Sequence, residues 1–263
     1  MISVETFATA AEASQALSAG SRFMAGGTLV MGELNYGVQG IHRIIRTTDP
    51  SLFEIGAGGS RITLGSQVTM AAVISNQQLM FLAEAARAVG GPAIRNAATV
   101  GGNLFAPHPY GDFAVALLAL DATIHLANGN NLPLEEFLQE RSGLVVSVSF
   151  DRPSSDEFRF RKVQRIKPKG VSVMSMAARL SRSAGRLSNA RIAYGAMGNQ
   201  PLRAKAVEHA LEGASLDESG IKPALEQAVA DIDPPTDALA SSWYRRETAP
   251  VHLRRLLLGE DRR

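Results

Sequence analysis

Two stretches of the chain each place a pair of adjacent glycines directly after a short apolar run. The first is Arg22 to Leu34 (RFMAGGTLVMGEL) and the second is Arg95 to Asp112 (RNAATVGGNLFAPHPYGD). Adjacent glycines let the backbone adopt positive φ and approach another group closely. Successive amides at such a turn form a cradle for a phosphate or pyrophosphate. Each pair therefore predicts either a tight turn alone or a turn that holds a phosphate.

The spacing of the glycines excludes two common nucleotide-binding folds. Neither stretch is a GxGxxG or a Walker sequence, so the Rossmann and P-loop folds are not predicted. Two glycine turns with Thr28 and Thr99 as nearby hydroxyl donors suit a long ligand that carries phosphates in its middle. A dinucleotide has that shape.

The first fifty residues predict a small α/β unit. Thr9 and Glu12 form a capping box that opens a helix ending at Gly20. The sequence then predicts, in order, a buried strand at 22–25, a helix at 29–37 and a parallel strand at 41–47.

Residues 51–155 predict a second lobe. The expected elements are a strand at 61–70, helices over 69–89 broken near Gln77, an apolar helix at 112–121, and strands at 122–127 and 143–150 with a hairpin turn at 128–131.

A Pro- and Ser-containing linker, Asp151 to Glu157, separates this lobe from a different pattern. Three strands of an antiparallel sheet are expected at 158–166, 171–180 and 190–198, followed by helices at 203–213, 217–230 and 241–258. Strands followed by helices indicate an α+β domain.

Composition excludes several classes of function. With 45% hydrophobic and 20% charged residues, the 263-residue chain is typical of an ordinary globular protein, and it contains no apolar run long enough for a membrane span. The chain has no cysteine, which excludes disulfides, thiolate nucleophiles and its own iron–sulfur cluster. The absence of cysteine, together with an N-terminus unlike a secretion signal, predicts that the protein is located in the cytoplasm. Five scattered histidines predict no metal site, and a net charge of +2 gives no case for nucleic acid.

Basic residues gather in one short segment. Six of them lie between residues 159 and 169: Arg159, Arg161, Lys162, Arg165, Lys167 and Lys169. The segment is either a solvated strand edge and loop or a surface that meets an anionic cofactor or an acidic partner subunit.

Four segments, MAGGT, IRNAATVGGNL, PYGDFAVALLALDA and ARIAYGAMGNQPLRAKAVEHALEG, together resemble the FAD-binding subunit of the molybdenum hydroxylases. This is the medium subunit of carbon monoxide dehydrogenase-type enzymes and the flavin domain of xanthine dehydrogenase. The resemblance runs in order over nearly the whole chain. It implies an α+β fold with a two-lobed FAD-binding domain of the vanillyl-alcohol-oxidase (PCMH) type at 1–155, whose lobes are about 1–50 and 51–155. A C-terminal domain of a small antiparallel sheet with helices would occupy 156–263.

The resemblance also assigns roles to residues. The first glycine loop would cradle the pyrophosphate of noncovalently bound FAD, and the second would lie beside the ribityl chain and pyrophosphate. By position these loops are Met24, Ala25, Gly26, Gly27, Thr28, Leu29, Val30 and Met31, and then Thr99, Gly101, Gly102 and Asn103. Asp112 would accept hydrogen bonds from flavin hydroxyls, cap a helix over 113–120, or do both. Val145 would pack near the isoalloxazine, and Arg161 would approach the flavin carbonyl edge.

Two positions depart from the family pattern. Leu29 stands where Asp or Ser is usual, and Gly170, Val171 and Ser172 stand where many members carry Gly-Asp-Tyr to shield a flavin face. His108 lies in the motif, either as a loop histidine or facing the flavin, and Tyr194 and Trp243 are expected in the core. Replacing Gly101 or Gly102 with valine is expected to abolish flavin binding and to leave the chain folded.

The implied function is an electron-transfer subunit that receives electrons from iron–sulfur clusters and passes them through FAD to NAD+, oxygen or a quinone. The implied partners are an iron–sulfur small subunit and a molybdopterin large subunit, in a dimer of heterotrimers. No residue of this chain is expected to be catalytic. Two alternatives are a structural subunit that retains the fold without tight FAD and a free-standing flavin reductase of the same fold.

Overall fold

The computed structural model describes residues 2–166 and 170–260. The N-terminal unit is a parallel sheet of order β1–β3–β2, formed by β1 (Ser3–Phe7), β2 (Ser21–Phe23) and β3 (Arg43–Thr47). Strands β2 and β3 were predicted, whereas β1 was not.

Helix α1 (Ala10–Ala16) begins with the predicted capping box, in which the Thr9 hydroxyl accepts from the Glu12 amide at 3.2 Å and the Glu12 carboxylate accepts from the Thr9 amide at 3.1 Å. The helix ends at Ala16 and not at Gly20.

The next unit is a five-stranded antiparallel sheet of order β4–β5–β8–β6–β7. Its strands are β4 (Ile55–Gly56), β5 (Arg61–Gly65), β6 (Thr123–Leu126), β7 (Asn131–Pro133) and β8 (Val145–Asp151). The helical segments of this part of the chain are α2 (Val30–Asn35), which joins β2 to β3, then η1 (Pro50–Phe53), α3 (Met70–Ser75), η2 (Gln77–Leu82), α4 (Ala83–Ala88), α5 (Pro92–Arg95), α6 (Val100–Leu104), α7 (Asp112–Ala119) and α8 (Leu134–Glu140).

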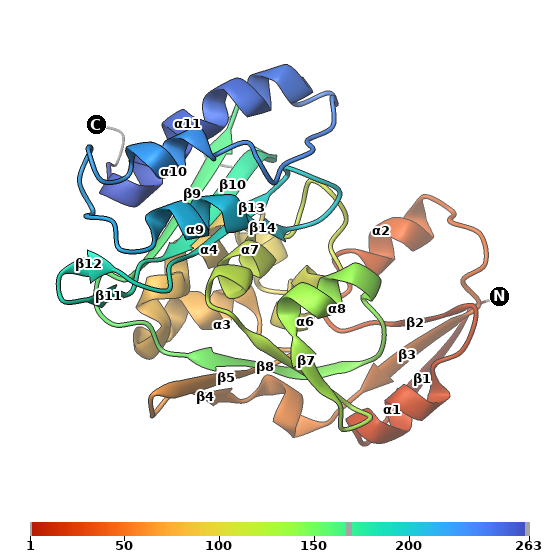
Figure 1. Ribbon diagram of the computed structural model, residues 1–263. Coiled ribbons are helices and arrows are strands. Elements are labelled where there is room, and N and C mark those ends of the chain that lie inside the picture. Colours follow the sequence, from red (N-terminus) through yellow and green to blue (C-terminus); the bar gives the residue numbers. More distant parts are fainter. Residues whose placement is uncertain (1, 167–169, 261–263) are drawn as a thin grey trace.

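The C-terminal part contains an antiparallel sheet of order β14–β13–β10–β9 and a short hairpin, β11 (Arg182–Ser183) with β12 (Arg186–Leu187). The four strands of the sheet are β9 (Phe158–Gln164), β10 (Ser172–Arg179), β13 (Arg191–Gly195) and β14 (Leu202–Arg203). Helices α9 (Lys205–Leu211), α10 (Lys222–Glu226) and α11 (Ser242–Leu258) cover its outer face (Figure 1). No helix in the described ranges is both long and apolar enough to cross a bilayer.

Helix α7 lies between the two parts of the molecule and is buried along its whole length. All eight of its residues are buried, which accounts for a sequence that is apolar on every face after Asp112. One side packs on α4 and α6 and the other packs on β10 and β13. The inner face of the C-terminal sheet contributes Phe160, Ala177 and Ala193 to the same hydrophobic core as α7. Residues of β10 that alternate with these, such as Met176, belong to a second core beneath α9 and α11.

Candidate functional site

The first glycine pair forms a loop between β2 and α2. Gly27 has φ +75°, a conformation that glycine adopts without steric cost. A Cβ on Gly26 would lie 1.5 Å from the carbonyl oxygen of Ala97. Gly26 is therefore required because the loop touches the backbone just before the second glycine pair. The structure brings the two glycine elements together.

The amides of the first loop are unused within the protein. No described residue accepts a hydrogen bond from the N–H groups of residues 25–29, whereas the amides of Met24 and Met31 donate to the carbonyls of Ile45 and Gly27. Leu29, at the N-cap of α2, supplies no side-chain cap. Five successive backbone donors are thus available for an anionic group, and a polar residue at position 29 is absent.

The second glycine pair is not a turn. Gly101 and Gly102 lie in the first turn of α6, whose N-cap Thr99 accepts from the Gly102 amide at 3.0 Å. The amides of Val100, Gly101 and Asn103 donate to the carbonyls of Val68, Ser66 and Thr99. All four amides from 100 to 103 already have acceptors, so the element is neither a tight turn nor an open amide turn, and its place beside a ribityl chain and pyrophosphate stays a prediction.

Gly101 packs directly against the residue that follows β5. A Cβ at this position would lie 2.8 Å from the Cβ of Ser66 and 3.0 Å from its carbonyl oxygen. Valine at 101 would therefore disturb the fold, which corrects the expectation that such a variant loses only flavin. The hydroxyl of Ser66 and Nε2 of Gln67 are buried without a hydrogen-bond partner among the described residues. Such orphaned groups beside a glycine element are what a polar ligand would satisfy.

Asn103 and Asp112 connect this element to α7 and to the C-terminal sheet. Asn103 Oδ1 accepts from the Ala114 amide at 2.9 Å. Asp112 is 6% exposed, and its carboxylate accepts from Lys162 Nζ at 2.9 Å and from the Ser172 hydroxyl at 2.6 Å. The N-cap of α7 is Gly111, with no side-chain cap, so the alternative role of Asp112 as an N-cap is wrong.

Arg161 points away from Asp112. On β9, Phe160 joins the inner core and Lys162 reaches Asp112, while the Arg161 guanidinium donates to the Glu260 carbonyl at 3.1 Å, beyond the end of α11. Successive strand residues face opposite sides of a sheet, so the basic side chain beside Asp112 is Lys162. Sequence reasoning missed Lys162 and Ser172, although strand alternation from Phe160 could have found Lys162. Val145 is buried at the start of β8.

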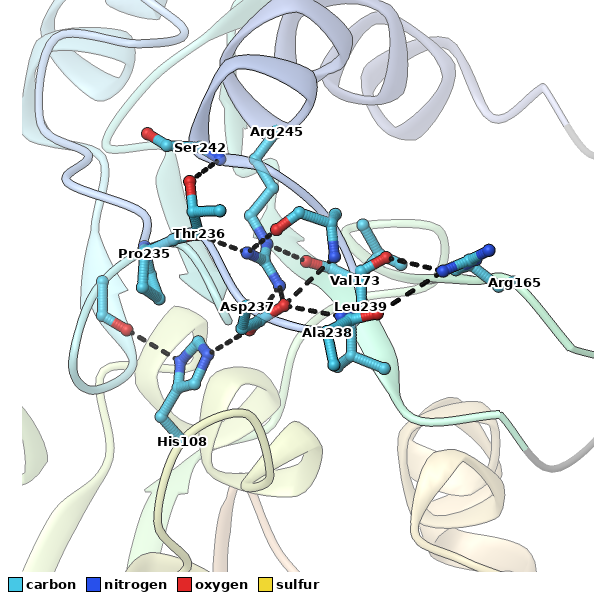
Figure 2. Close-up of polar contacts among 12 residues, drawn as sticks. His108, Arg165, Val173, Pro235, Thr236, Asp237, Ala238, Leu239, Ser242 and Arg245 are labelled. Atoms are coloured by element: carbon cyan, nitrogen blue, oxygen red, sulfur yellow. Dashed lines mark hydrogen bonds and ion pairs between the residues drawn. The ribbon is translucent and has the colours of Figure 1, made fainter.

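A polar network fixes the loop that follows α6. The ring nitrogens of His108 contact the Gly198 carbonyl and the Asp237 carboxylate, each at 3.1 Å. Figure 2 shows Arg245 opposite His108, with Asp237 between them. The Arg245 guanidinium is fully buried and bonds both Asp237 oxygens, at 3.0 and 2.9 Å, and the carbonyl of Val173. His108 is thus a partner of the C-terminal part of the chain rather than a solvated loop residue.

Most of the basic segment is used internally. The Arg159 guanidinium bonds the carbonyls of Leu256 and Leu257 in the last turn of α11, where a cation also stabilises the helix dipole. Arg161 and Lys162 are also engaged, and the exposed Arg165 lies 3.5 Å from the carbonyls of Ala238 and Leu239 (Figure 2). Lys167 and Lys169 lie outside the described residues. Most of the described basic side chains of this segment are therefore bonded within the protein, and contact of the segment with an anionic cofactor or an acidic partner stays a prediction.

The two expected core aromatics have different outcomes. Tyr194 is fully buried under the C-terminal helices, as predicted. Trp243 is 69% exposed near the start of α11, so its assignment to the core is wrong. Among the described residues, no group of three or more acidic, histidine or cysteine side chains could hold a metal ion.

Two family models match the chain over most of its length. The FAD binding domain in molybdopterin dehydrogenase matches residues 1–149, and the CO dehydrogenase flavoprotein C-terminal domain matches residues 158–259. The free amides at 25–29, and the orphaned Ser66 and Gln67 groups beside the second glycine element, are polar groups of the kind that a bound pyrophosphate satisfies.

Individual relatives agree with these models. The chain is 26% identical over 204 residues to the glyceraldehyde dehydrogenase medium chain of Sulfolobus acidocaldarius, with 72% of each chain covered. It is 25% identical over 258 residues to the carbon monoxide dehydrogenase medium chain of Hydrogenophaga pseudoflava, covering 92% of this chain and 89% of that one. A solved carbon monoxide dehydrogenase structure from H. pseudoflava shares the fold, with a TM-score of 0.89, 23% identity, and 97% and 96% of the two chains covered. The chain belongs to the family of FAD-binding subunits of the molybdenum hydroxylases, and it is a flavoprotein oxidoreductase subunit with FAD as its cofactor.

Proposed function

We propose that the chain is an electron-transfer subunit that receives electrons from iron–sulfur clusters of a partner and delivers them to NAD+, oxygen or a quinone. FAD, when bound, supplies the redox chemistry of this transfer. The observation that carries the proposal is the loop at 25–29, whose five amides have no acceptor in the described protein and which rests on the backbone of Ala97. The residues of this chain would bind and orient the cofactor.

In this proposal the first loop, 24–31, holds the pyrophosphate through its backbone donors. Thr99, Gly101, Gly102 and Asn103 line the other side, where their role is close packing because their amides are already engaged. Asp112 would accept from flavin hydroxyls while Lys162 and Ser172 fix its carboxylate. Lys162 takes the place proposed for Arg161, since its ammonium group is the cation that reaches Asp112.

The partners would be an iron–sulfur small subunit and a molybdopterin large subunit, in a dimer of heterotrimers. The chain has no cysteine to ligate a cluster, so electrons would arrive from another polypeptide. A cytoplasmic complex suits a chain without disulfides. The side chains of Arg159, Arg161 and Lys162 are engaged inside the protein, so the docking surface is expected elsewhere than this segment.

The test of cofactor placement is the visible spectrum of purified variants. We expect Gly27→Val to lose the flavin absorbance near 450 nm, because valine disfavours φ +75° and would reshape the loop. Gly129→Val is the matched control. Gly129 also has a positive φ, +88°, it lies in the β6–β7 turn, and a Cβ added there would have no other atom within 4 Å. Equal flavin content in both variants would refute this placement.

Co-expression with the candidate partners followed by size-exclusion chromatography tests the subunit role. We expect one peak that contains all three chains and both redox groups. If the chain instead elutes alone at low salt and reduces a small substrate with NAD(P)H, it is a free-standing reductase and the electron-transfer proposal is wrong.

A further inference from the structure

A polar cavity lies between the five-stranded sheet and the C-terminal sheet, away from the glycine elements. Its volume is about 190 Å³. It is bounded by the edge of β5, the end of α7, the end of β8 and the ends of β10 and β13. The charged residues that line it are Arg61, Asp121, Asp151, Arg179 and Arg191.

Two of these arginines are direct neighbours across the sheet. Arg179 on β10 is in register with Arg191 on β13, and both project from the face that carries Ala177 and Ala193 into the inner core. Like charges directly opposite one another in a sheet repel. The arrangement therefore needs negative charge in front of the pair.

The protein supplies only part of that charge. Arg61 pairs with Asp151 at 3.2 Å, while Arg191 Nε is 3.8 Å from Asp121, beyond hydrogen-bond distance. Asp121 is also shared with Arg203, at 3.5 Å. Arg179 has no ion pair or side-chain hydrogen bond with any described residue.

The guanidinium groups are also short of acceptors. Nε of Arg179 and Nε of Arg191 are both buried without a hydrogen-bond partner in the described protein. A buried donor without an acceptor is rare in folded proteins and points to a missing water, ion or ligand. Two adjacent arginines that line one polar cavity, each with an unsatisfied Nε, point to an acceptor with several negatively charged oxygens.

We propose that this cavity binds a tetrahedral oxyanion: inorganic phosphate, or the phosphoryl group of a nucleotide. Arg179 and Arg191 would hold it from the C-terminal sheet, with Arg61 on β5 facing it from the FAD-binding part. Ser181 and Asn189, which also line the cavity, add neutral polar groups. The anion would replace the repulsion between the two arginines with shared charge-assisted hydrogen bonds.

This site is separate from the one that holds FAD. Arg179 pairs with Phe158 of β9, and Lys162, which bonds Asp112, lies four residues further along the same strand. At about 3.3 Å per residue the two positions are roughly 13 Å apart. Because the arginines come from both parts of the molecule, a bound oxyanion would link β5 to β10 and β13.

The experiment titrates inorganic phosphate into the full-length, FAD-loaded chain at constant ionic strength, with chloride as the replaced anion. Binding is measured by isothermal titration calorimetry and by the unfolding temperature. We expect saturable binding and a Tm that rises with the logarithm of phosphate concentration, by roughly 5–10 °C at about 100 times Kd. Wild-type chain that shows no saturable phosphate binding overturns the proposal, whatever the variants do.

Variants locate the site. Arg179→Gln and Arg191→Gln are each expected to weaken phosphate binding at least tenfold, whereas Arg87→Gln, at an exposed position on α4, is the matched control and keeps it. Equal affinity in Arg179→Gln, Arg191→Gln and wild type would overturn the assignment to this cavity. AMP as competitor identifies the source of the oxyanion. If AMP displaces phosphate at a lower concentration than the same amount of inorganic phosphate would need, the site takes the phosphoryl group of a nucleotide. If AMP does not displace phosphate, the site takes free phosphate.

Discussion

Lys162→Met tests whether the ion pair with Asp112 fastens the C-terminal sheet to α7. The lysine side chain is 14% exposed and the aspartate 7%, and the two charges are 2.9 Å apart. Methionine keeps the apolar stem but leaves the carboxylate with only the Ser172 hydroxyl as a donor, and it also removes the bond from Lys162 to the Ala88 carbonyl. Removing one partner of a buried pair costs about 3–5 kcal/mol, and partial exposure of the lysine places this case near about 3 kcal/mol.

The assay is urea unfolding of the FAD-free chain, followed by circular dichroism, for wild type, Lys162→Met, Asp112→Asn and the double variant. Asp112→Asn removes the charge that Lys162 neutralises, so it should relieve much of the loss caused by methionine. We expect the double variant to be more stable than the sum of the single losses predicts, by at least about 1 kcal/mol. A loss below about 1 kcal/mol in Lys162→Met, or additivity within about 0.5 kcal/mol, would refute the reasoning.

Three further changes have defined outcomes. Gly26→Ala should destabilise the chain and release FAD, because its Cβ would lie 1.5 Å from the Ala97 carbonyl oxygen; unchanged urea unfolding would contradict this contact. Tyr194→Phe should leave stability unchanged or raise it by about 1 kcal/mol, since the buried hydroxyl has no partner in the described protein; a loss above about 1 kcal/mol would reveal one. Burial opposes ionisation of Asp237, but hydrogen bonds from His108, the Ala240 amide and Arg245 outweigh it and hold the pKa of Asp237 well below its usual range. Because the pKa of Asp237 is lower in the folded state than in the unfolded state, its carboxylate stabilises the fold at pH values above the unfolded-state pKa. The free energy of unfolding should therefore fall as the pH drops below about 4. Asp237→Asn should flatten that fall in urea titrations at several pH values.

Short-range patterns in the sequence predicted most elements correctly. The Thr9 capping box, the strand at 41–47, the apolar helix from Asp112 and the three C-terminal strands all carry local signals of capping or periodicity. The strand β1 carries none, because its residues are mostly exposed and include Ser3 and Glu5. Its place in the sheet depends on pairing with β3, some forty residues away in sequence.

The candidate site was harder to predict because it depends on tertiary contacts. Two adjacent glycines disfavour a helix by about 1 kcal/mol each, yet Gly101 and Gly102 lie in α6, where the tertiary contact with Ser66 leaves no room for a side chain at 101. The choice between Arg161 and Lys162 depends on a single residue of strand register, which a motif match alone does not resolve. The partner of His108 lies 129 residues away, so no local pattern indicates it.

The shared core around α7 limits how this protein can be dissected. Without the C-terminal sheet, α7 would present an apolar surface after Asp112 to water, and without α7 the sheet would expose Phe160, Ala177 and Ala193. A fragment ending near residue 155 would therefore aggregate on expression, although the two family models meet near that point. The same packing constrains chimaeras between relatives. If the two domains are joined at the linker, the residues of α7 and of the inner face of the C-terminal sheet must come from the same relative.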